Sequence, residues 1–145
     1  MNPLGFSLPQ TKSTLMTIED DVPPIILVVE DIHETRDGIE KLLSADGYRV
    51  APARDQRDAI ESAQRACPDL ILICLPGSLR EVVFAALSIR QCAGEHVPVV
   101  VFCIEGVSDG DEVFIGRNVH LICPDNFNQL RSLIARLLSR DSIAA

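Results

Sequence analysis

Two carboxylates and three thiols are the residues of this sequence whose types and positions could support chemistry. Glu30 and Asp31 follow the apolar run IILVV, and Cys74, Cys103 and Cys123 each end a later apolar run. Thiolates and carboxylates are ligands for Zn²⁺ and other thiophilic metals, and two neighbouring thiols can form a redox pair. The spacing matches no compact zinc motif, and buried cysteine also serves as a small apolar residue. The three thiols and Asp31 are therefore candidate metal ligands, with a redox pair and simple packing as the alternatives.

The apolar runs before these residues have the composition of strands buried on both faces, as in a parallel sheet. Segments with helical spacing lie between them, for example Ile39, Leu42 and Leu43 on one helix face. This alternation predicts an α/β fold: a doubly wound five-stranded parallel sheet flanked by helices. The expected strands are 25–29, 48–53, 70–74, 97–103 and 119–123, and the expected helices are 33–45, 55–67, 79–93, a short one over 108–116, and 128–140.

Ligands of such sheets bind outside the carboxyl ends of the strands. The strand-end carboxylates and thiols are therefore expected to share one rim of the molecule. Asp55 stands where the second helix should begin and is the expected N-cap of that helix.

Composition and charge limit the classes of function. We expect a lead-in over 1–24, one domain over 25–140 and a tail over 141–145. The net charge of −8 opposes direct nucleic-acid binding. No apolar run reaches the roughly 18 residues of a membrane span, and nothing resembles a secretory signal. We expect a cytoplasmic protein whose five cysteines form no disulfide framework.

The segments ILVVED, TRDGIEKLLSADGYRV, ARDQRDAIESAQRACPDLILICL, IRQCAGEHVPVVVF and GRNVHLICP together carry a family resemblance. The chain from 25 to 140 resembles a response-regulator receiver domain, the CheY-like module of two-component signalling. The resemblance implies the flavodoxin-like receiver fold with strand order 2-1-3-4-5. It also implies that Glu30 and Asp31 stand in place of the family's acidic metal-binding pair.

The departures from the family pattern fall on its phosphorylation chemistry. By the resemblance, Cys74 occupies the position of the phosphorylated aspartate, and Cys103 that of a Thr or Ser. Cys123 occupies the position of the phosphate-pairing lysine, and Pro124 that of the following cis-proline. His120 corresponds to the aromatic switch residue. The five residues Glu30, Asp31, Cys74, Cys103 and Cys123 thus form a degenerate phospho-acceptor pocket.

These departures predict a pseudo-receiver that is not an enzyme and has no cofactor, with only weak Mg²⁺ binding because a hard oxygen ligand is lost. Such a protein acts by contact with a protein partner or as a homodimer. By the resemblance, the contact face comprises the family's fourth helix, fifth strand and last helix, with His120, Pro124 and Arg131. The alternative is a sensor of metal or oxidant that uses Cys74, Cys103 and Cys123.

Overall fold

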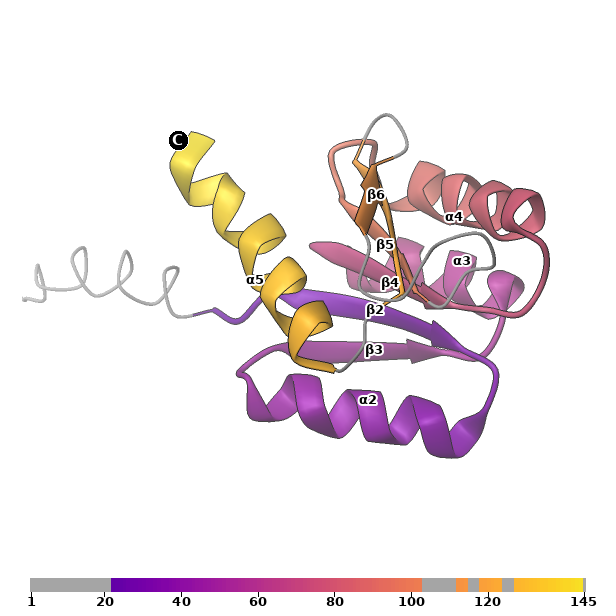
Figure 1. Ribbon diagram of the computed structural model, residues 1–145, viewed down its shortest axis with the longest axis horizontal. Coiled ribbons are helices and arrows are strands. Elements are labelled where there is room, and N and C mark those ends of the chain that lie inside the picture. Colours follow the sequence, from indigo (N-terminus) through magenta and orange to yellow (C-terminus); the bar gives the residue numbers. More distant parts are fainter. Residues whose placement is uncertain (1–21, 103–111, 115–117, 124–126, 145) are drawn as a thin grey trace, which may run out of the picture.

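The computed structural model describes residues 22–102, 112–114, 118–123 and 127–144, arranged as Figure 1 shows. In this part of the chain the strands form one six-stranded sheet in the order β3-β2-β4-β5-β7-β6. The first five strands in that order run parallel, which confirms the predicted 2-1-3-4-5 sheet. The strands are β2 (Ile25–Glu30), β3 (Arg49–Ala53), β4 (Leu70–Cys74), β5 (Val99–Phe102), β6 (Glu112–Phe114) and β7 (Val119–Ile122).

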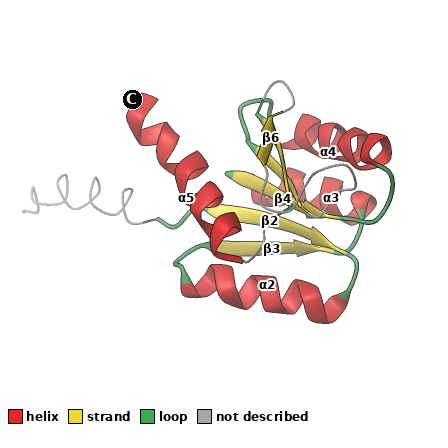
Figure 2. Ribbon diagram, viewed as in Figure 1, coloured by secondary structure: helices red, strands yellow, loops and turns green. Residues whose placement is uncertain are grey.

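Helices cover both faces of the sheet (Figure 2). One face packs against α3 and α4, through a buried cluster that includes Ala59 and Ile89. The other face packs against α2 and α5, through a cluster that includes Leu43 and Ile134. The helices are α2 (His33–Ala45), α3 (Gln56–Ala66), α4 (Leu79–Ala93) and α5 (Phe127–Ala144). Two covered faces explain why the central strands are apolar without alternation.

Local signals in the sequence set where the helices begin. The Asp55 side chain accepts a hydrogen bond from the Asp58 N–H at 2.8 Å, so the predicted N-cap is confirmed. At the start of α4, Ser78 and Glu81 form a reciprocal capping box. The expectation for Leu42 was wrong, because this residue is 44% exposed. Of the three apolar residues expected on the inner face of α2, only Ile39 and Leu43 are buried.

The segment 108–116 departs from its predicted short helix. Residues 112–114 form β6 instead, which pairs antiparallel with β7. The open edge of β7 supplies backbone hydrogen-bond partners that a helix of so few residues could not provide for itself. The contact face inferred from the resemblance included a helix in this segment, and the described part of it is a strand.

Two further features concern the helices: where the last one ends, and whether any could cross a membrane. The last helix continues to Ala144, beyond the boundary at residue 140 that the sequence suggested. Within the described ranges, no helix combines the length and apolar character needed to cross a bilayer.

Candidate functional site

Glu30 and Cys74 lie side by side at the carboxyl ends of two neighbouring strands. They are partners in the register of β2 and β4, at the rim where the strand-end argument expected both. Glu30 is buried, with 6% of its surface exposed. Cys74 is partly buried and packs against the cluster beneath α2 and α5. A cysteine and a buried glutamate are therefore neighbours across two strands at this rim.

The Glu30 carboxylate is held by the turn that follows its own strand. Its Oε2 accepts a hydrogen bond from the Ile32 N–H at 3.0 Å. Burial raises the pKa of Glu30, and the neighbouring Asp31 raises this pKa further. Asp31 itself is exposed. Of the expected acidic pair, one carboxylate thus faces solvent while the other is desolvated.

Arg36 is a residue at this rim that the sequence argument missed. Its Nη1 donates a hydrogen bond to the Glu30 backbone carbonyl at 2.6 Å. Its Nη2 donates to His33 Nδ1 at 3.2 Å, and His33 Nε2 lies 3.2 Å from Asp37 Oδ2. The signal available in the sequence was an arginine in the first turns of the helix that follows the strand end. Arg36 brings a positive charge to the start of α2, next to the acidic pair.

Cys123 lies at the same carboxyl-end rim of the sheet as Cys74, but not beside it. It follows β7, which is separated from β4 by β5. At the usual spacing of about 4.8 Å between strands, the backbones of Cys74 and Cys123 are about 10 Å apart. Cys123 is partly buried. Cys103 and Pro124 lie outside the described residues, so their places in the pocket stay predictions.

The described residues by themselves contain no ready-made metal centre. In the ranges that the structure covers, no three His, Cys, Asp or Glu side chains gather closely enough to hold an ion. A metal site built from Cys74, Cys103, Cys123 and Asp31 requires Cys103 and therefore stays a prediction.

The two residues assigned to a switch or contact face have clear positions. His120 is buried on β7, between Val100 of β5 and Phe114 of β6. Arg131 of α5 forms a two-pronged ion pair with Asp46, with Nη2–Oδ1 at 2.5 Å and Nε–Oδ2 at 2.7 Å. The Arg131 side chain holds the pKa of the Asp46 carboxyl below its usual range.

The Arg131–Asp46 pair lies away from the rim of Glu30 and Cys74. Asp46 precedes β3, whose first residue Arg49 is level with Ile25, at the other end of β2 from Glu30. The structure therefore does not bring Arg131 together with the strand-end residues. It gives this arginine a partner within the chain, and its role in a contact face stays a prediction.

Several solved structures share the fold of this chain. No family model matches the chain, and no curated protein matches it. Among solved structures, chemotaxis protein CheY4 from Vibrio cholerae superimposes with a TM-score of 0.62 at 20% identity, over 79% of this chain and 98% of that one. The chain has the receiver fold. The receiver domain of sensor histidine kinase PA1611 from Pseudomonas aeruginosa gives a TM-score of 0.58 at 27% identity, over 81% and 96% of the two chains.

A longer neighbour matches this chain over only part of its own length. The anti-anti-sigma factor PhyR from Bartonella quintana superimposes with a TM-score of 0.63 at 19% identity. The match covers 92% of this chain and 54% of PhyR. These structural neighbours are CheY-like response-regulator receivers or contain a region of the same fold.

Proposed function

We propose that the protein is a pseudo-receiver: a response-regulator-like signalling protein that acts by protein contact without being phosphorylated. The observation that carries the proposal is the pairing of Cys74 with buried Glu30 at the strand-end rim. The resemblance assigns the acceptor aspartate to this position on β4, and the chain has a thiol there. The oxygen nucleophile of an acyl phosphate is therefore missing.

The remaining groups support the same proposal. Phosphoryl transfer requires Mg²⁺ to spread the charge of the phosphoryl oxygens and a cation to hold the product. The PA1611 receiver is described with magnesium coordinated in its active-site cleft. In this chain the donor set fits Mg²⁺ poorly, because Cys74 is a soft ligand and the Glu30 carboxylate is buried, bonded to Ile32 and raised in pKa. Cys123 adds no positive charge where the resemblance expects a lysine.

A receiver fold without an acceptor transmits a signal through its surface. We infer a protein partner or a second copy of the chain as the recipient, in a two-component or phosphorelay setting. The protein has no catalytic role in this proposal.

The decisive experiment offers the pocket a phosphoryl group. The purified chain is incubated with acetyl phosphate and Mg²⁺, and its intact mass is measured. The wild-type chain should keep its mass, and an ordinary receiver domain in the same mixture should gain one phosphoryl group. The double variant Cys74→Asp/Cys123→Lys restores the nucleophile and the cation and should gain reactivity. A stable phosphoryl adduct on the wild-type chain would refute the proposal.

A thiol-based sensor is the second candidate, because Cys74 and Cys123 close strands at the same edge of the sheet. Metal analysis of the purified protein, and thiol titration with and without a chelator, separate the two candidates. A stoichiometric bound metal, or thiols that react only after chelation, would favour the sensor. Metal-free protein whose rim thiols react only after denaturation would leave the pseudo-receiver.

A further inference from the structure

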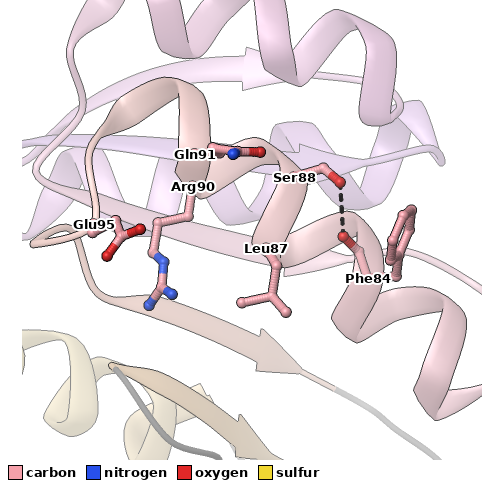
Figure 3. A pocket seen from close by; sticks show the side chains of 6 residues that line it. All are labelled: Phe84, Leu87, Ser88, Arg90, Gln91 and Glu95. Atoms are coloured by element: carbon pink, nitrogen blue, oxygen red, sulfur yellow. Dashed lines mark hydrogen bonds between the residues drawn. The ribbon is translucent and has the colours of Figure 1, made fainter.

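We draw no further inference here: the strongest candidate, the outer face of α4 with exposed Phe84 and Leu87 beside a hollow of about 350 Å³ (Figure 3), carries none because nothing in the described part of the chain shows what covers it.

Discussion

The attachment of α5 to the sheet gives the sharpest stability prediction. Among the described side chains of α5, four are buried, and Leu130 and Ile134 of these have no exposed surface. Replacing Ile134 by alanine removes three carbon groups, which contribute about 2.4 kcal/mol at about 0.8 kcal/mol each. A cavity term brings the expected loss of unfolding free energy to about 3–4 kcal/mol. This is a large part of the 5–15 kcal/mol typical of a domain.

The measurement is equilibrium unfolding in urea, followed by circular dichroism and by tyrosine fluorescence. Tyr48 is the only tyrosine and the chain has no tryptophan, so the fluorescence reports one site. That site is informative because Tyr48 lines the same groove as Arg131 and Ser132 of α5. Ser132→Ala, an exposed change on the same helix, serves as the control and should alter stability by less than about 0.5 kcal/mol.

A loss below about 1 kcal/mol for Ile134→Ala, with both probes showing one transition, would refute the packing argument. It would mean that α5 does not bury this side chain against the sheet. A loss near that of the control would have the same meaning.

Three further predictions concern single groups. Ser78→Ala should lower the unfolding free energy by about 1 kcal/mol, because it removes an N-cap acceptor; Ser88→Ala, within the same helix, should not, and equal losses would contradict the capping role. The raised pKa of Glu30 means that its contribution to stability is present below the ordinary value of 4.5 and is lost as pH rises through the folded-state pKa. Glu30→Gln should therefore match the wild type at low pH and gain relative stability toward pH 7 in urea titrations; a constant difference would show that burial does not perturb this carboxyl. Burial, aided by Asp46, also raises the pKa of Tyr48 above its ordinary value of 10.0, so absorbance titration should give a higher phenol pKa in the folded chain than in urea, and equal values would contradict the burial.

The parallel sheet was predictable because its signal is local. Runs such as 25–29 and 70–74 are continuously apolar, and only a strand covered on both faces needs that composition. The strand-end rule then predicted that Glu30 and Cys74 share one rim of the sheet. The cap at Asp55 followed from its position just before a helical segment.

What the sequence did not reveal depends on contacts between distant residues. Residues 112–114 become a strand only because β7 offers an edge to pair with, and a three-residue segment has no period of its own. Arg131 finds Asp46 across 85 positions of the chain, which no local pattern encodes. The burial of Glu30 likewise depends on how α2 is positioned after β2. So does the hydrogen bond from Arg36 to the Glu30 backbone carbonyl.

The extra strand β6 restricts the backbone motion of β7. In a sheet that ended at β7, one side of that strand would be open, and its backbone could shift by breaking a single row of hydrogen bonds. Here β6 and β5 hold β7 from both sides, at the level of His120. Displacing the His120 backbone therefore requires two rows to break together. A message relayed through this position would have to travel by rotation of the imidazole within a fixed frame, which is a faster and smaller motion than the sliding of a strand.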